Sequence, residues 1–461
     1  MLLVSGVGYG AGAAHTRRNE MARRYAILGG GALGLTTALR LLQRGHAVTL
    51  FEREPEPGGL AAGFLVNPPA PDGSGQPDVW LDKFYHHIFR SDTAATALIA
   101  ELGLNDLLDW RRPLTTALRG GRVYQLDSAR SVLRFQPISM LSRLRMGAAL
   151  AMLKLLPSAG PLEGRRAAPW IRRTMGAGAY DAVWGPLLKG KFGAVADEIA
   201  LPWFWARVHD RTAELGYVRG GFQRLYNRLA ERVRELGGDP RFGAAIQRIE
   251  RDGDRIAVTY APVGAPEQPQ RDTFDRCVST LPTRLTCQLA PELPQEYRAR
   301  YEWGRAYGAH CLILALDRQL TDGYWMNIND PGYPFMVLVE HTNYMPVEDY
   351  AGRRLIYLGN YRAMDDPLFR LSKQEVLDQF TPQIARVNPA FDATWIQESW
   401  MFAAPYAQPI VTTDYREHIP PFDTPLPGLF AANMFQVYPH DRGQNYSIEL
   451  AERLVRHLEG A

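Results

Sequence analysis

Three glycines near the start of the chain have the spacing of a dinucleotide-phosphate site. Gly29, Gly31 and Gly34 form the pattern G-x-G-x-x-G between a short apolar run and a helical run. The first glycine allows a tight turn, the second lets the backbone approach a pyrophosphate, and the third lets helix and strand pack closely. Glu52 ends the next apolar run, where a carboxylate accepts hydrogen bonds from ribose hydroxyls. These residues therefore predict the binding of a dinucleotide.

A strand–turn–helix–strand unit must position these residues. The apolar runs 25–28 and 47–51 predict two strands, and Gly45 is placed to end the helix between them. One face of that helix is apolar at the spacing i, i+3, i+4, i+7, through Leu35, Ala38, Leu39 and Leu42. The helix N-terminus then offers unpaired N–H groups and a positive dipole end to the phosphates.

A second glycine turn, Gly58-Gly59, followed by Leu60, comes shortly after Glu52, where an ordinary NAD dehydrogenase does not need one. This combination resembles the two-part signature of the FAD-dependent amine oxidase superfamily. That superfamily includes protoporphyrinogen oxidases, phytoene desaturases and, more distantly, UDP-galactopyranose mutases. The resemblance runs from residue 23 to residue 460 and implies that the cofactor is FAD.

The resemblance implies an α/β fold in which a Rossmann-like FAD-binding domain is assembled from three chain segments, 23–85, 215–290 and 425–461. Residues 86–214 and 291–424 would form an inserted substrate or cap domain of an antiparallel sheet plus helices. Residues 1–22 are expected to be a flexible extension, and whether Met21 is the true start is left open. The resemblance implies these cofactor-binding residues: Gly29, Gly31, Ala32, Gly34, Glu52, Arg53, Gly58, Gly59, Leu60, Thr280, Asn433, Arg442, Asn445, Tyr446 and Ser447.

The inserted segments have their own strand and helix patterns. Strands are expected at 309–316, 335–340, 355–358 and 394–401, and a hairpin at 245–250 and 255–260. Residues 184–193, which include Lys191, resemble the helical cap of the family. Pro186 and the glycines of this run are also explained by a plain helix end and reversal.

The catalytic residues are unknown, and the candidates are His86, His87 and Tyr406. The two histidines belong to residues 80–89, which resemble the segment that passes close to the flavin ring. A structural role, with the imidazoles meeting backbone carbonyls, is an equal alternative. Tyr406 is one of four aromatic residues first assigned to the substrate cavity, although core packing explains such residues as well: Trp325, Tyr361, Trp400 and Tyr406.

Residues 138–156 form an apolar helical run with basic residues interspersed, too short and too charged to span a bilayer. The expectation is a buried helix of the substrate domain. The alternative is an interfacial helix that brings basic side chains near lipid headgroups: Arg134, Arg143, Arg145, Arg165 and Arg166.

Composition limits the other function classes. The 461 residues, 46% hydrophobic and 22% charged, predict a globular protein of two or three domains, and the net charge of +3 is small. No basic run or aromatic platform indicates nucleic-acid binding, and the three cysteines lack metal-ligand spacing. Residues 1–20 make a poor signal peptide, so a cytoplasmic location is expected, with peripheral membrane contact as an alternative. The oligomeric state is left open.

Three functions remain at this stage. The first is an FAD-dependent oxidoreductase that accepts a hydride from a C–H or C–N centre of an unidentified small molecule and passes electrons to an acceptor. The second is a UDP-galactopyranose mutase-like enzyme that uses reduced FAD on a nucleotide sugar without net redox change. The third is a flavin-stabilised binding protein with no turnover.

Overall fold

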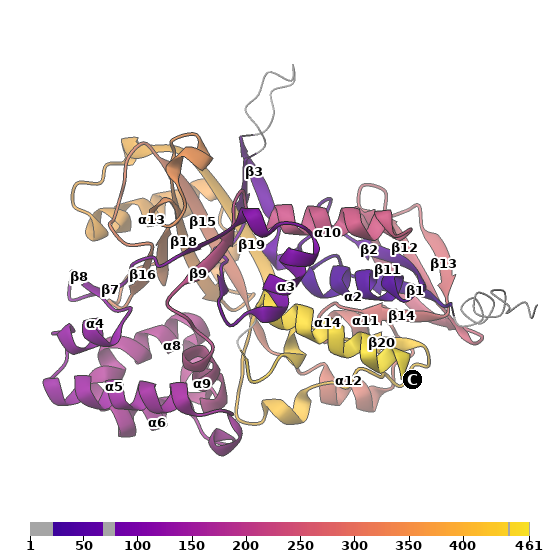
Figure 1. Cartoon of the computed structure of the whole chain (residues 1–461), viewed down its shortest axis with the longest axis horizontal. Coiled ribbons are helices and arrows are strands. Elements are labelled where there is room, and N and C mark those ends of the chain that lie inside the picture. Colours follow the sequence, from indigo (N-terminus) through magenta and orange to yellow (C-terminus); the bar gives the residue numbers. More distant parts are fainter. Residues whose placement is uncertain (1–21, 68–78, 441–442, 461) are drawn as a thin grey trace, which may run out of the picture.

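The computed structural model describes residues 22–67, 79–440 and 443–460, and it is a mixed α/β fold with several sheets (Figure 1). A five-stranded parallel sheet has the order β10-β2-β1-β14-β20. Its strands are β1 Arg24–Leu28, β2 Ala47–Glu52, β10 Asp239–Phe242, β14 Arg276–Ser279 and β20 Leu429–Ala431. The strands expected at 25–28 and 47–51 are confirmed.

Three helices pack together beside this sheet, namely α2 Ala32–Gln43, α10 Gln223–Glu235 and α14 Gln444–Glu459. The leucines of the apolar stripe on α2, at positions 35, 39 and 42, are buried as the spacing predicted. This packing fixes the start of α2 against the ends of the parallel strands.

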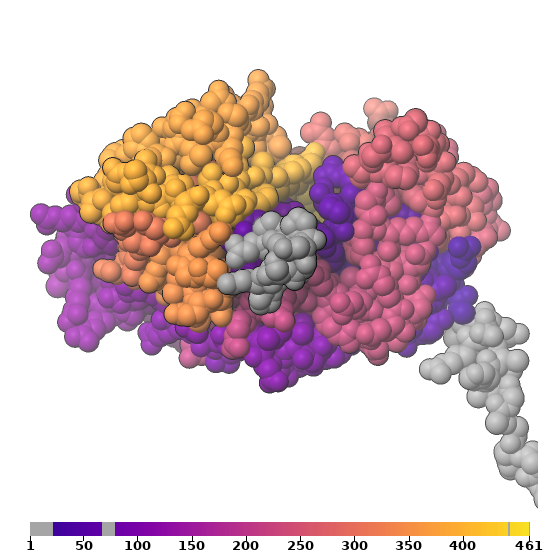
Figure 2. Space-filling view, turned by 90° about the horizontal axis from the view of Figure 1, so that it is seen from above, coloured from indigo at the N-terminus to yellow at the C-terminus, as the bar shows by residue number. Residues whose placement is uncertain are grey.

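A three-stranded antiparallel meander lies next to the parallel sheet. Its strands are β11 Ala244–Asp252, β12 Arg255–Pro262 and β13 Gln270–Phe274. The first two strands confirm the expected hairpin. Seen from above, the pink residues that include this meander lie on one side of the molecule and the orange residues of a larger sheet on the other (Figure 2).

The larger sheet has seven strands in the order β19-β15-β18-β17-β16-β7-β8, and all its pairs are antiparallel except β16 with β7. The strands are β7 Thr115–Arg119, β8 Arg122–Gln125, β15 Ala306–Leu316, β16 Trp325–Ile328, β17 Val337–Glu340, β18 Arg354–Arg362 and β19 Ile396–Pro409. The four strands expected between 309 and 401 are therefore present. The start of the last was placed slightly early, because Ala393–Trp395 form a 3-10 turn.

Residues 129–209, called the helical region below, hold six helices: α4 Ala129–Arg134, α5 Met140–Leu155, α6 Ala167–Met175, α7 Ala177–Ala179, α8 Gly185–Phe192 and α9 Leu201–His209. They surround an aromatic-rich core that includes Trp170, Phe192, Trp203 and Phe204. The expectation that residues 138–156 form a buried helix is wrong. Only one face of α5 packs against its neighbours, and Leu155 is 82% exposed.

Short elements connect these parts. They are β3 Gly63–Asn67, β4 Val79–Asp82, β5 Ile88–Phe89, α3 Thr93–Glu101, β6 Leu108–Arg111, β9 Leu215–Val218, α11 Thr283–Leu289, α12 Gln295–Tyr301 and α13 Lys373–Val387. Among the described residues, no helix is long and apolar enough to cross a membrane. All three cysteines, Cys277, Cys287 and Cys311, are buried free thiols.

Candidate functional site

The first glycine turn lies between β1 and α2, and two of its three motif glycines are required by packing. Gly29 has a φ of +109°, which side-chain-bearing residues rarely adopt. A Cβ on Gly29 would lie 2.4 Å from Thr280 Oγ1, and a Cβ on Gly34 would lie 1.9 Å from the Gly29 carbonyl oxygen. The turn therefore closes tightly on itself and on β14.

Gly31 differs from the other two, because a Cβ there would find no atom nearer than 3.9 Å, at the Gly58 carbonyl oxygen. Gly31 is the N-cap of α2 and gives no side-chain cap, and the first helical bond runs from Leu35 N–H to Gly31 O at 3.0 Å. The N–H groups of the first turn consequently have no partner within the helix. Open space beside unpaired donors at a positive dipole end fits a pyrophosphate.

The second glycine turn lies directly beside the first. Gly58 and Gly59 have φ values of +120° and +57°. The Gly58 N–H donates to the Gly30 carbonyl oxygen at 2.9 Å, and Gly31 and Gly58 form a parallel bridge. We call residues 29–34 and 58–59 together the glycine cradle.

Glu52 is held at the edge of the glycine cradle by backbone donors. Its Oε2 accepts from Gly30 N–H at 2.6 Å, and its Oε1 accepts from Glu54 N–H at 2.8 Å. Each carboxylate oxygen keeps a lone pair for a further donor. The arrangement fits a ribose whose hydroxyls donate to Glu52 while its phosphates meet α2.

Thr280 and Asn433 use their side chains within the protein. Thr280 Oγ1 donates to Leu28 O at 2.7 Å. The buried Asn433 amide donates to Thr283 Oγ1 at 3.1 Å and to Leu281 O at 3.2 Å. Their backbone N–H groups are bonded as well, that of Thr280 to Leu28 O at 2.9 Å and that of Asn433 to Gln436 Oε1 at 2.6 Å.

The side chains at the start of α14 also have structural partners. Asn445 Oδ1 accepts from the N–H groups of Ala94 and Ala95, at 2.9 and 3.0 Å, and so caps α3. Ser447 Oγ donates to Gly443 O at 3.1 Å. The backbone at this helix start, rather than these side chains, is what a flavin could meet.

Tyr446 stacks on His440 with ring centroids 4.4 Å apart, and it hydrogen bonds to Asp210. Burial, reinforced by the Asp210 carboxylate, raises the pKa of Tyr446, so its hydroxyl stays protonated at neutral pH. The residue fastens α14 to the end of the helical region. Arg442, the other residue expected near the flavin, lies outside the described residues.

Arg53 and Leu60 have opposite surroundings. The Arg53 side chain is 70% exposed and pairs with Glu54 at 2.9 Å. Leu60 packs in a cluster on the wall of the seven-stranded sheet, which holds Leu60, Phe84, Ala309, Tyr361, Met336, Tyr307 and Ala407. The structure therefore extends the glycine cradle toward the sheet through Leu60.

Lys191 is a buried cation beside this cluster. Its Nζ donates to Gln408 Oε1 at 2.8 Å and lies 4.9 Å from the Tyr361 ring centroid and 5.8 Å from that of Trp203. Arg207 lies 5.7 Å from the same Trp203 ring. In the sequence, Lys191 stands out only as part of residues 184–193, which resemble the helical cap of the family. The scarcity of lysine, at five in the chain, was the signal that could have singled it out.

His87 lies among the rings of Phe89, Tyr324 and Trp325, and its Nδ1 is 3.4 Å from Tyr324 Oη. Burial, followed by the charges of Arg211, His86 and Arg207, lowers the pKa of His87 to about 3. The imidazole is therefore neutral at pH 7, and it can relay a proton only through a neutral tautomer. His86 lies next to it, and the assignment of either histidine to catalysis stays a prediction.

Asp82 is a buried carboxyl that sequence analysis missed. Its Oδ1 accepts from Phe222 N–H at 3.0 Å, and burial raises its pKa to about 7. A carboxyl that titrates near neutral pH is suited to proton transfer. The sequence could have indicated this residue, because Asp82 is the one carboxylate in residues 80–89.

Tyr406 has a φ of +53°, which is rare for a residue with a side chain. It lies in β19 where the pairing with β15 shifts register between Tyr307 and Ala309. A bulge of this kind redirects side chains, and backbone strain of this kind is concentrated at functional sites. Its catalytic assignment stays a prediction.

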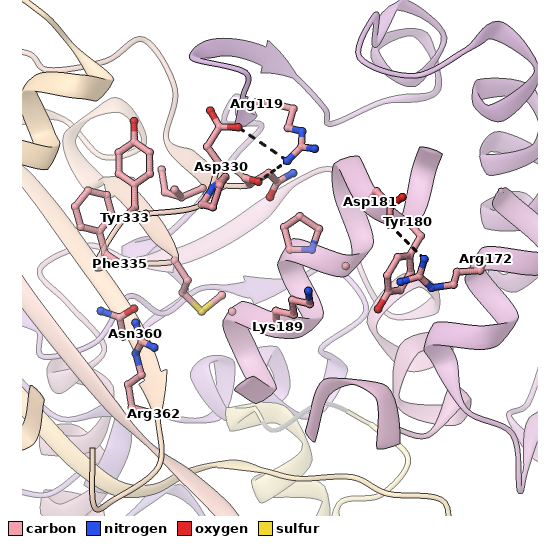
Figure 3. A pocket seen from close by; sticks show the side chains of 18 residues that line it. Arg119, Arg172, Tyr180, Asp181, Lys189, Asp330, Tyr333, Phe335, Asn360 and Arg362 are labelled. Carbon is pink, nitrogen blue, oxygen red and sulfur yellow. Dashed lines mark hydrogen bonds and ion pairs between the residues drawn. The ribbon is translucent and has the colours of Figure 1, made fainter. Parts of the chain in front are cut away.

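A cavity of about 430 Å³ opens between the helical region and the seven-stranded sheet (Figure 3). Four cations and two carboxylates line it: Arg119, Arg172, Lys189, Arg362, Asp181 and Asp330. Arg172 pairs with Asp181 at 3.3 Å and Arg119 with Asp330 at 4.0 Å. Lys189 and Arg362 form no ion pair with any described residue. Met336 lines this cavity and also packs in the Leu60 cluster, so the two are adjacent.

The family model described as flavin containing amine oxidoreductase matches residues 34–440. No curated protein matches the sequence. A putative protoporphyrinogen oxidase from Exiguobacterium sp. 255-15 has 16% identity and a TM-score of 0.73, over 95% of this chain and 98% of that one.

Two further structures share the fold at similarly low identity. A reduced UDP-galactopyranose mutase has 15% identity and a TM-score of 0.73, over 95% of this chain and 96% of that one. A putrescine oxidase bound to putrescine has 17% identity and a TM-score of 0.69, over 96% of this chain and 100% of that one. Since the family model matches most of the sequence, this chain belongs to the flavin-containing amine oxidoreductase family and is a flavin-dependent oxidoreductase.

Proposed function

We propose that the protein is an FAD-dependent oxidoreductase that accepts a hydride from a C–H or C–N centre of a small-molecule substrate. The observation that carries the proposal is the bridge between the two glycine turns, with Glu52 bonded to Gly30 beside it. This geometry supports the binding of a pyrophosphate and a ribose. FAD contains both groups, whereas FMN has a single phosphate and a ribityl chain. The family membership supplies the flavin chemistry.

We also infer that the FAD-binding domain combines residues 23–85, 215–290 and 425–461. Each segment supplies at least one strand of the parallel sheet, which supports this interpretation. Residues 86–214 and 291–424 are inferred to form the substrate domain. In support, β7 from the first of these segments pairs with β16 from the second.

Separate groups of residues would bind the cofactor and shield the reacting centre. The first turn of α2 would hold the pyrophosphate and Glu52 the ribose. When bound, the flavin ring supplies an acceptor for a hydride. The Leu60 cluster would exclude water from the reacting centre, and the buried Lys191 would favour negative charge that develops beside it.

The charged cavity supports a substrate that carries an acidic group. Lys189 and Arg362 are unpaired among the described residues, and the remaining cations there already have carboxylate partners. A carboxylate or phosphate on the substrate would supply the missing negative charge. Met336 lines the cavity and also packs in the Leu60 cluster, which supports a path for the substrate from the cavity toward that cluster.

The test has two parts. The purified protein should be yellow and release about one FAD per chain on denaturation, with an adenine-containing flavin identified by chromatography. Anaerobic addition of substrates from a metabolite panel should then bleach the oxidised flavin. A colourless protein that FAD does not reconstitute would remove the proposal.

A mutase is the second candidate, because two cations in one cavity that have no ion-pair partner among the described residues also suit the diphosphate of a nucleotide sugar. The spectrum separates the two functions. The substrate of an oxidoreductase bleaches the oxidised flavin. A mutase needs its flavin reduced beforehand, and that flavin remains reduced after turnover.

A further inference from the structure

Helix α5 lies at the outer edge of the helical region (Figure 1). It presents an apolar stripe to solvent. The exposed side chains follow helical spacing over four turns: Leu141, Leu144, Ala148, Ala151, Met152 and Leu155. Leu141 is 65% and Leu144 55% exposed. The opposite face of the helix packs inward through Met146, Ala149 and Leu153, so the stripe is a second, unpartnered apolar face.

The stripe continues onto neighbouring residues. Leu133, near the end of α4, and Met140, at the start of α5, are 45% and 56% exposed. Most exposed large hydrophobic side chains of the described residues are on these two helices. A contiguous apolar surface of this kind marks an interaction site rather than the scattered exposure of ordinary surfaces.

The surrounding charge is strongly positive. Residues 129–180 contain nine arginines and lysines and one acidic residue, Glu163, although the whole chain has a net charge of only +3. Arg145 flanks the stripe on one side, and its Nε donates to Thr174 O at 2.9 Å. Lys154 flanks it on the other, and its Nζ donates to Arg211 O at 2.6 Å. The apolar stripe is therefore bordered by cations.

We propose that this face docks on an anionic lipid bilayer, with α5 lying in the plane of the interface. An amphipathic helix with an apolar face and a basic border binds such a surface by burying the apolar side chains among acyl chains and pairing the cations with headgroups. A second copy of the chain is disfavoured as the occupant. Two such faces would bring their cations together, and nothing in residues 129–180 except Glu163 would offset the repulsion.

The proposal is independent of the cofactor and the reaction. It is tested by cosedimentation of the full chain with phosphatidylcholine vesicles that either contain or lack phosphatidylglycerol. The expected result is binding to the anionic vesicles that weakens as salt is added. The double variant Leu141→Glu with Leu144→Glu should lower the partition coefficient at least roughly tenfold, since each leucine loses its transfer into lipid.

Val263→Glu is the matched control, because Val263 is 52% exposed and follows β12, far along the chain from α5. It should bind like the wild type, and circular dichroism should show that both variants fold. Failure of the wild type to bind anionic vesicles would overturn the proposal, as would equal binding to neutral vesicles or an equal loss in Val263→Glu. A wild-type dimer that Leu144→Glu dissociates, without vesicle binding, would assign the face to a second copy instead.

Discussion

Gly34 in the glycine cradle and Gly147 in α5 are both helical glycines, yet their surroundings differ completely. A Cβ on Gly34 would lie 1.9 Å from a backbone oxygen, whereas a Cβ on Gly147 would meet no atom within 4 Å. The glycine cradle is built from backbone atoms in close contact, and it leaves open only the space beside Gly31. The charged cavity is instead lined by side chains from several elements.

This difference separates two parts of the proposed function. Under the proposed function, cofactor binding at the glycine cradle would depend on backbone N–H groups, so it would tolerate few changes in sequence. Substrate selection at the charged cavity would depend on the charges of Lys189, Arg362 and their neighbours, so single substitutions could change it. One fold can therefore keep its cofactor while it changes its substrate.

The largest effect is expected for Gly34→Ala. The new methyl group would overlap the Gly29 carbonyl oxygen, so either the turn or α2 must move. The free energy of unfolding should fall by ~3 kcal/mol or more. Urea denaturation measures this, and a loss below about 1 kcal/mol would show that the turn relaxes freely.

Gly31→Val should separate binding from folding within the same turn. A Cβ at this position would lie no closer than 3.9 Å to the nearest described atoms, so the protein should fold with a small change in melting temperature. The flavin should be lost, because the valine would fill the space assigned to the pyrophosphate. Absorbance of the purified variant and reconstitution with FAD measure this, and normal FAD binding would place the phosphates elsewhere.

The double variant Lys189→Gln with Arg362→Gln should change selection and leave the glycine cradle untouched. Losing two charged contacts to an acidic substrate should raise KM roughly 10–100-fold, with kcat and flavin content preserved. Steady-state kinetics on the substrate found by the metabolite panel measure this. A fall in kcat at constant KM would instead place these cations at the reacting centre.

Two buried titratable groups should give pH effects of opposite sign. Burial lowers the pKa of His310, in β15, to about 4, so its protonation in the unfolded chain destabilises the fold as pH falls below about 6.5. Relative to the wild type, His310→Leu should gain up to ~1.4 kcal/mol in unfolding free energy per pH unit between pH 6 and pH 5.

Asp82 acts in the opposite direction, because burial raises its pKa to about 7 and the fold loses stability as pH rises toward that value. Asp82→Asn should therefore gain on the wild type from pH 5 to pH 7. Urea denaturation across this pH range checks both variants. Parallel curves for wild type and variant would show that the group titrates as it does in the unfolded chain.

The smallest effect is the gain expected from Gly147→Ala. Alanine in the middle of α5 meets open space and has the higher helix propensity, so the free energy of unfolding should rise by about 0.5–1 kcal/mol. Thermal denaturation measures it. A destabilised variant would show that Gly147, like Gly34, has no room for a methyl group.

The glycine cradle and its unit could be predicted because their causes are short-range. Turn conformations at Gly29 and Gly58, the apolar spacing on α2 and the strand that ends at Glu52 all follow from neighbouring residues. The hairpin of β11 and β12 could be predicted for the same reason. These elements form in nearly any context that buries their apolar side.

Long-range packing decided the rest. Four elements, β7, α6, α8 and β18, bring Arg119, Arg172, Lys189 and Arg362 to one cavity, and no local pattern links them. The same holds for Asn445, whose side chain caps α3 because the two helices pack together. The exposed stripe of α5 follows from which neighbours cover that helix. Burial and charge proximity depend on contacts between distant segments, whereas periodicity and turn chemistry record only the residues on either side.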